Sequence, residues 1–131
     1  MTHFPDLSVY EYSKRSGHAL NVGWLGQGHS FETGPVSTDV RDALVRLAGN
    51  SVNVMRGLHY CDFCDAESPL YVETSDGQVR ASLGTGEIQA IAENGVVYLA
   101  PTLLVHYIDA HDYLPPAVFL SAVKVSSSRF R

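Results

Sequence analysis

The chain has 131 residues, the size of one domain with its own hydrophobic core. Hydrophobic residues make up 45% of the sequence, which excludes a disordered or fibrous protein. The formal net charge of −5 argues against nucleic-acid binding, and two cysteines are too few for a disulfide framework. We therefore predict a single domain over residues 1–131.

The N-terminal region lacks the pattern of a targeting segment. Asp6 and Glu11 interrupt it, and no basic stretch precedes an apolar one. The uncharged run at 94–108 is too short to cross a bilayer. We expect a cytoplasmic protein that does not associate with membranes.

In the first half of the chain the clearest element is a helix. Before it, residues 21–25 predict a short strand. Apolar residues then recur at helical spacing at Val40, Ala43, Leu44, Leu47 and Ala48. Ser37, Thr38 or Asp39 can cap this helix, and Gly49-Asn50 can end it. Residues 51–55 alternate in polarity like another strand.

The second half predicts two hairpins followed by two helices. Strands at 70–73 and 79–83 flank Ser75-Asp76-Gly77, and strands at 87–92 and 96–99 flank Glu93-Asn94-Gly95. A helix is expected at 102–109, with Pro101 at its first position. Another should follow Pro115-Pro116, with Ala117, Leu120, Ala122 and Val123 packing inward and 126–131 as a polar tail. This order predicts an α+β domain, an antiparallel sheet of hairpins with helices on one face.

Two pairs of side chains have spacings that suit a metal ion. Cys61 and Cys64 form a C-x₂-C pair, and His106 and His111 form an H-x₄-H pair. Zn²⁺ prefers four tetrahedral thiolate and imidazole ligands, and a hairpin fits between the two pairs. The sequence thus predicts a zinc site that staples the domain.

The helical spacing of the histidines places a condition on this site. Positions five apart on a regular helix point about 140° away from each other. We therefore expect the helix to end near Asp109-Ala110, so that His111 bends back toward His106. His59 offers a substitute ligand, because it lies only two residues before Cys61.

Two other interpretations of the cysteines compete with zinc. Cysteine is often buried as a plain core residue, and His106 could equally be a hydrogen-bonded core imidazole. A thioredoxin-type redox pair would need a helix N-terminus to depress the thiol pKa. Here the acids Asp62, Asp65 and Glu67 follow instead, which disfavours that chemistry.

A catalytic zinc would need a proton shuttle, and known signatures for one are missing. The sequence contains neither the H-x-E with P-C-x₂-C of zinc deaminases nor the H-E-x-x-H of zincins. Glu87, which follows Gly84-Thr85-Gly86, is the best candidate acid/base. We favour the simpler interpretation that Glu87 is an ordinary strand-end or turn-stabilising carboxylate.

Several sequence blocks together resemble a family of small, uncharacterised bacterial proteins. The blocks are Phe4-Pro5-Asp6-Leu7-Ser8-x-Tyr10 with Asn21-Val22-Gly23-Trp24-Leu25, Arg56-Gly57-x-His59-x-Cys61-x₂-Cys64, and the run from Ala100-Pro101 through His106-Tyr107-Ile108-x₂-His111-x-Tyr113-x-Pro115-Pro116-x₂-Phe119. The resemblance implies that the Cys/His blocks and the Tyr-x-Pro-Pro block are parts of one structural arrangement. It carries no established activity.

The sequence therefore supports two functional hypotheses. The first is a small cytosolic module with a structural zinc that acts by binding another protein, as an immunity-type or regulatory adaptor does. The alternative is a small zinc-dependent hydrolase with three protein ligands, a metal-bound water and Glu87 as acid/base.

Overall fold

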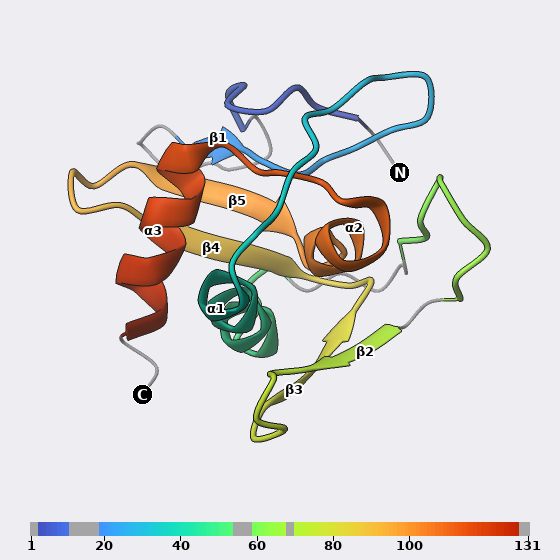
Figure 1. The fold of residues 1–131 in the computed structure, drawn as a ribbon. Coiled ribbons are helices and arrows are strands. Elements are labelled where there is room, and N and C mark those ends of the chain that lie inside the picture. The colour runs from blue at the N-terminus through green and yellow to red at the C-terminus, as the bar shows by residue number, and fades with distance from the viewer. Residues whose placement is uncertain (1–2, 11–18, 54–58, 68–69, 129–131) are drawn as a thin grey trace.

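The computed structural model describes residues 3–10, 19–53, 59–67 and 70–128 (Figure 1). Within them lie the helices α1 (Thr38–Gly49), α2 (Leu104–His111) and α3 (Ala117–Ser127). The strands are β1 (Ala19–Asn21), β2 (Leu70–Glu73), β3 (Arg80–Leu83), β4 (Glu87–Ile91) and β5 (Val97–Pro101). The predicted α+β class is confirmed. No helix in these described ranges is long and apolar enough to cross a lipid bilayer.

The strands form two small sheets. Both predicted hairpins are present, but β2 and β3 make a two-stranded sheet of their own, while β4 and β5 belong to a three-stranded sheet of order β1-β5-β4. The strand β1 runs parallel to β5 at the edge of that sheet. A parallel pair needs a long crossover between its strands, and here the crossover contains α1 and the β2–β3 hairpin.

The first strand lies earlier in the chain than predicted. We expected it at 21–25, but it ends at Asn21. Gly23 follows with φ +78°, and a Cβ at this position would lie 2.4 Å from the Leu104 side chain. This close approach to α2 needs a glycine and turns the chain out of the ladder. Of the strand expected at 51–55, Val52 forms an isolated bridge with Glu87, and 54–55 lie outside the described residues.

The helix α1 begins and ends where the sequence indicates. The Ser37 side chain accepts a hydrogen bond from the Val40 amide, and the Asn50 amide donates to the Leu47 carbonyl. Its apolar residues are buried against α3, β3 and β4. The helical pattern thus corresponds to one face of the core.

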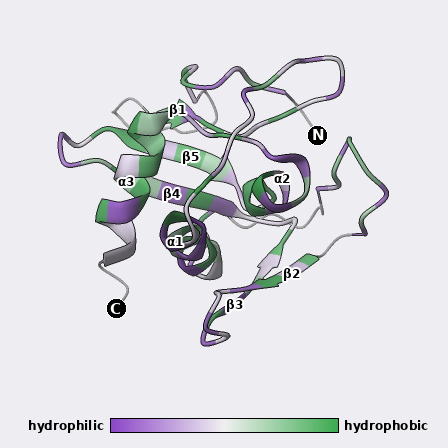
Figure 2. Cartoon of the chain, viewed as in Figure 1, coloured by the Kyte–Doolittle hydropathy of each residue, from purple (hydrophilic) through white to green (hydrophobic). Residues whose placement is uncertain are grey.

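The strand β5 is buried on both faces. Tyr98 and Ala100 belong to the main core with the helices, and Tyr98 meets Phe119 of α3 with ring centroids 6.0 Å apart. Leu99 lies between these two residues and faces the other side of the sheet. It packs there in a second cluster with Trp24 and Tyr10 from the N-terminal part of the chain. Figure 2 shows green, hydrophobic segments on both β5 and α2.

Two predictions for the C-terminal region are wrong. Ala117, expected to pack inward, is exposed, because α3 begins there and turns Phe119 into the core instead. Residues 126–128, expected in a polar tail, continue the helix or its cap, and Ser126 is buried. The Ser126 hydroxyl donates to the Ile91 carbonyl and accepts from the Ile91 amide at the edge of β4. Residues 129–131 lie outside the described part of the chain.

Candidate metal centre

The loop 59–67 carries the two cysteines and is anchored by the phenylalanine between them. The Phe63 ring packs edge-on against Phe31 and Tyr107, with centroids 5.5 and 6.0 Å away. The Phe63 amide donates to Sγ of Cys61 over 3.4 Å, so the chain turns back on itself here. The His59 amide donates to the Gly84 carbonyl, which ties the start of the loop to the end of β3.

The helix α2 carries the two histidines and is held in place on several sides. Its apolar residues Leu104 and Tyr107 are fully buried. On its exposed side, the Asp109 carboxylate accepts two hydrogen bonds from the Arg41 guanidinium of α1, at 3.2 and 2.9 Å. The helix ends at Asp112, which is left-handed with φ +56°. These contacts fix the direction in which His106 and His111 project.

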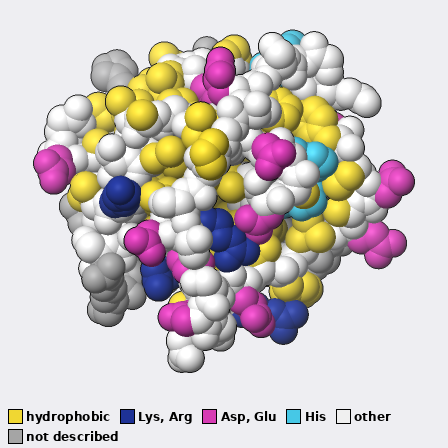
Figure 3. Space-filling model, viewed as in Figure 1, with side chains coloured by type: hydrophobic (Ala, Val, Ile, Leu, Met, Phe, Trp, Pro, Cys, Tyr) yellow, Lys and Arg dark blue, Asp and Glu magenta, His cyan; other side chains and the backbone are white. Residues whose placement is uncertain are grey.

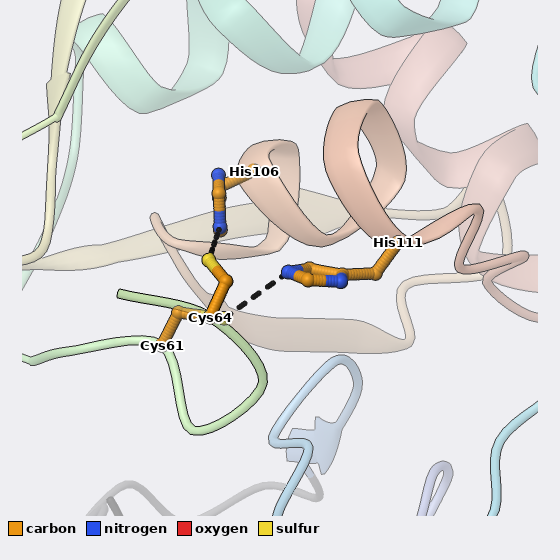
Figure 4. Close-up of side chains that lie close together, drawn as sticks. All are labelled: Cys61, Cys64, His106 and His111. Carbon is orange, nitrogen blue, oxygen red and sulfur yellow. Dashed lines mark hydrogen bonds between the residues drawn. The ribbon is translucent and has the colours of Figure 1, made fainter. Parts of the chain in front are cut away.

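The four predicted side chains meet at one point (Figure 4). Sγ of Cys61 lies 3.3 Å from Nε2 of His111, and Sγ of Cys64 lies 3.3 Å from Nε2 of His106. One ligand atom from each of the four residues lies within 4.8 Å of every other. Among the described residues this is a possible metal site, with two sulfur and two nitrogen donors.

The condition that we placed on α2 is wrong. The helix does not end near Asp109-Ala110 but continues through His111. The two imidazoles nevertheless approach to 5.2 Å between ring centroids. His111 occupies the last helical position. Its imidazole contacts the Cys61 thiol, whereas the His106 imidazole contacts the Cys64 thiol. The two histidines therefore meet different sulfurs of the loop.

The two sulfur–nitrogen contacts in the cluster are close to the distances expected around a tetrahedral ion. Zn–S bonds of about 2.3 Å and Zn–N bonds of about 2.0–2.1 Å place neighbouring S and N ligands about 3.6 Å apart at the tetrahedral angle. The observed sulfur–nitrogen distances of 3.3 Å are within a few tenths of that value. Two of the six distances between ligand atoms therefore suit a tetrahedral metal, and the other four are no longer than 4.8 Å.

The pKa shifts within the cluster suit an exchange of the thiol protons for a bound cation. Burial raises the pKa of the Cys61 thiol, and the neighbouring Cys64 raises it further, while the Phe63 amide acts in the opposite direction. Burial lowers the pKa of His106, and the nearby His111 adds to that effect. A protonated thiol and a neutral imidazole are the forms in which a metal-free cluster avoids buried charge. A divalent cation would displace the thiol protons.

The substitute ligand His59 points elsewhere. Its ring lies 6.4 Å from the Trp24 ring, between centroids, and is not part of the four-residue group. Burial lowers the pKa of His59, and the nearby Glu87 opposes that shift. His59 is thus a half-buried neutral side chain on the N-terminal side of the loop.

The candidate acid/base Glu87 is also not a member of the four-residue group. Its carboxylate is buried and accepts hydrogen bonds from the Tyr10 hydroxyl at 3.0 and 3.1 Å and from the Asn53 amide at 2.8 Å. Sequence reasoning missed Tyr10 and Asn53 as partners, because no local spacing connects three residues so far apart in the chain. This network joins the N-terminal segment to the start of β4.

Two further features near the centre had no clear signal in the sequence. The Tyr113 hydroxyl donates to the Asp6 carboxylate at 2.7 Å, so the N-terminal segment is tied to the residue just after α2. The Tyr107 hydroxyl is buried without a hydrogen-bond partner among the described residues. Burial raises the pKa of Tyr107, and the nearby Cys61 and Asp62 raise it further, which keeps this phenol protonated.

The centre lies close to the molecular surface. Cys61 is buried, His106 and His111 are half-buried, and Cys64 is exposed. Histidine side chains reach the surface among hydrophobic and acidic ones in the space-filling view (Figure 3). A bound metal would be screened from solvent on the Cys61 side and approachable on the Cys64 side.

Comparison with known proteins gives a family but no activity. The family model described as "Domain of unknown function (DUF7919)" matches residues 2–124. The chain therefore belongs to this family, and the match includes all four side chains of the possible metal site. No curated protein and no solved structure matches the chain.

Proposed function

We propose that this chain is a cytosolic module with one structural Zn²⁺ held by Cys61, Cys64, His106 and His111. The observation that carries the proposal is the convergence of two thiols and two imidazoles, all with ligand atoms within 4.8 Å of each other. Two sulfur and two nitrogen donors suit Zn²⁺, whereas Mg²⁺ and Ca²⁺ prefer oxygen. A set of four protein ligands fills the tetrahedron and leaves no position for a reactive water.

The part that the metal would stabilise is the attachment of loop 59–67 to α2. Within the described residues, each thiol of the loop faces one imidazole of the helix. A metal would replace two thiol–imidazole contacts by four coordinate bonds, and binding to the folded state alone stabilises that state. The ion would thus act as a staple between two segments that are distant in sequence.

Metal analysis of protein purified without added zinc tests this proposal. We expect one Zn²⁺ per chain, and Co²⁺ substitution should give the spectrum of a tetrahedral site with two thiolates. The variants His106→Gln and His111→Gln should lose the metal, while the matched controls His29→Gln and His59→Gln should keep it. Less than about 0.2 equivalents of zinc, together with unchanged stability after chelation, would contradict the proposal.

We further propose that the module acts by binding a protein partner, as an immunity-type or regulatory adaptor does. Two aromatic side chains, Tyr60 beside the metal ligands and Tyr71 on β2, are more than half exposed. Exposed tyrosines are typical of protein interfaces. Affinity purification from the source cells should yield one partner with the wild type and lose it with Tyr60→Ser/Tyr71→Ser. The control Val118→Ser, which alters an exposed residue on α3, should retain it.

A further inference from the structure

The two cysteines of the centre differ in their access to solvent. Cys61 is only 7% exposed, and its sulfur accepts a hydrogen bond from the Phe63 amide. Cys64, three residues later, is exposed. An amide hydrogen bond and burial both make a thiolate less nucleophilic, whereas exposure gives an oxidant access. The centre thus contains one accessible sulfur and one protected sulfur.

The protected sulfur is well placed to react with the accessible one. The two sulfurs lie within 4.8 Å of each other, and the sequence contains no third cysteine to compete. The segment Cys61–Cys64 is in neither a helix nor a strand, so a small backbone adjustment can bring the sulfurs to bonding distance without breaking regular structure. Closure of an intramolecular disulfide is therefore the expected fate of an oxidised Cys64.

Such a disulfide would remove half of the ligands at once. His106 and His111 would remain as the only two donors of the group, too few to retain Zn²⁺ tightly. The disulfide would lie entirely within loop 59–67 and would make no connection to α2. Oxidation would therefore replace a bond between two segments by a bond within one of them.

We propose that Cys64 is a site of oxidative modification, and that hydroperoxides release the metal by converting Cys61 and Cys64 to a disulfide. This inference rests on the zinc site proposed above. The Cys64 thiolate attacks one peroxide oxygen, the O–O bond breaks, and the departing hydroxide takes a proton to form water. The Cys61 thiolate then attacks the Cys64 sulfur, the S–O bond breaks, and a second protonated hydroxide leaves as water. Two thiolates, one H₂O₂ and two protons thus give one disulfide, two waters and free Zn²⁺.

Zinc release measured with a chromogenic chelator tests the proposal on the zinc-loaded protein. Addition of H₂O₂ should release one Zn²⁺ for each disulfide formed, with a loss of two hydrogens by intact-mass analysis. A reductant with added zinc should restore the metal-bound form. Zinc retention with both thiols intact under peroxide that oxidises a small free thiol would overturn the proposal. Release accompanied by sulfinic acid without a disulfide would also overturn it.

A pair of matched variants separates the roles of the two cysteines. Cys61→His and Cys64→His each retain four zinc donors but only one thiol, so neither can close the disulfide. Cys61→His keeps the exposed thiol and should react with H₂O₂ about tenfold faster than Cys64→His. Equal rates would overturn the assignment of Cys64 as the first target.

The same experiment distinguishes this proposal from the one on which it rests. Wild-type protein without zinc as purified, and unaffected by chelation, would overturn both. Zinc that is present but resistant to peroxide would overturn only the oxidative role and would leave the structural staple intact.

Discussion

The two polar clusters of this protein differ in what completes them. The Glu87 carboxylate is satisfied by the protein itself, through the Tyr10 hydroxyl and the Asn53 amide. The Cys/His cluster brings two thiols and two imidazoles together. The contacts described within this group are two sulfur–nitrogen contacts of 3.3 Å. A buried carboxylate whose two oxygens both accept hydrogen bonds from neutral donors needs no further ligand. Converging thiols and imidazoles form a possible metal site, which under our proposal a cation completes.

The largest expected effect is that of removing the metal. Chelation, or the variant Cys61→Ser, should destabilise the protein by about 4 kcal/mol at a free zinc concentration a thousandfold above Kd. The reason is that the metal binds the folded state and not the unfolded one. Thermal unfolding with and without chelator measures the effect. Identical unfolding midpoints in the two conditions would contradict this expectation, because they would show that no bound cation stabilises the folded protein.

The next largest effect is expected at Glu87. Glu87→Gln should cost about 1–3 kcal/mol, because hydrogen bonds to a buried charged acceptor contribute that much. The zinc content should stay at that of the wild type, since Glu87 is not in the four-residue group. Urea unfolding and metal analysis of the variant test both points, and Tyr10→Phe provides the matched loss of one donor. A folded Glu87→Gln protein without zinc would show that the two clusters are coupled.

A second buried carboxylate, that of Asp42, tests how much such a hydrogen-bond network contributes to stability and over which pH range. Asp42 of α1 accepts hydrogen bonds from the Ser75 amide and hydroxyl. Burial alone would raise the pKa of Asp42, but the Ser75 hydrogen bonds and Arg41 lower it below its usual value. Because the folded-state pKa is depressed, the stabilisation is present above the unfolded value of about 3.9 and is lost as the pH falls through the folded value.

The variant Asp42→Asn should therefore be less stable than the wild type by about 1–3 kcal/mol at neutral pH. The difference between the two proteins should shrink when unfolding is measured below about pH 4. A difference that is independent of pH would mean that the charge on Asp42 does not contribute.

The smallest effect is expected at His59. His59→Gln should leave the zinc stoichiometry unchanged, because the His59 ring lies against Trp24 and outside the cluster. Its stability should change by no more than about 1 kcal/mol, the usual value for a partly exposed side chain. Loss of zinc in this variant, with retention in His111→Gln, would move the fourth ligand to His59.

Local patterns predicted the elements that depend on neighbouring residues. The helix α1 follows its cap and apolar spacing, and both hairpins follow their turn residues. The sequence also indicated the four side chains of the possible metal site, because two thiols and two imidazoles at these spacings suit Zn²⁺. Their approach in space was a hypothesis that only the packing of loop 59–67 on α2 could test.

Two of the errors involve partners that are remote in the sequence. The strand β1 ends at Asn21 because Gly23 passes close to Leu104, a residue 81 positions later. Ser126 is in a helix rather than a tail because its hydroxyl pairs with both backbone groups of Ile91. A local stretch of sequence contains only one member of each pair, so it does not reveal the contact. A serine such as Ser126 can be buried once its hydroxyl is hydrogen-bonded.

The sequence by itself determined the α+β class and the limits of α1, and it indicated the four soft donors of the possible metal site. Composition, periodicity and side-chain chemistry are local properties, and they are readable without a fold. Only the tertiary structure decided that His106 and His111 both face the cysteines, that His59 turns toward Trp24, and that Glu87 is enclosed by Tyr10 and Asn53. These outcomes depend on how whole elements pack, and therefore on the balance of burial over the entire core.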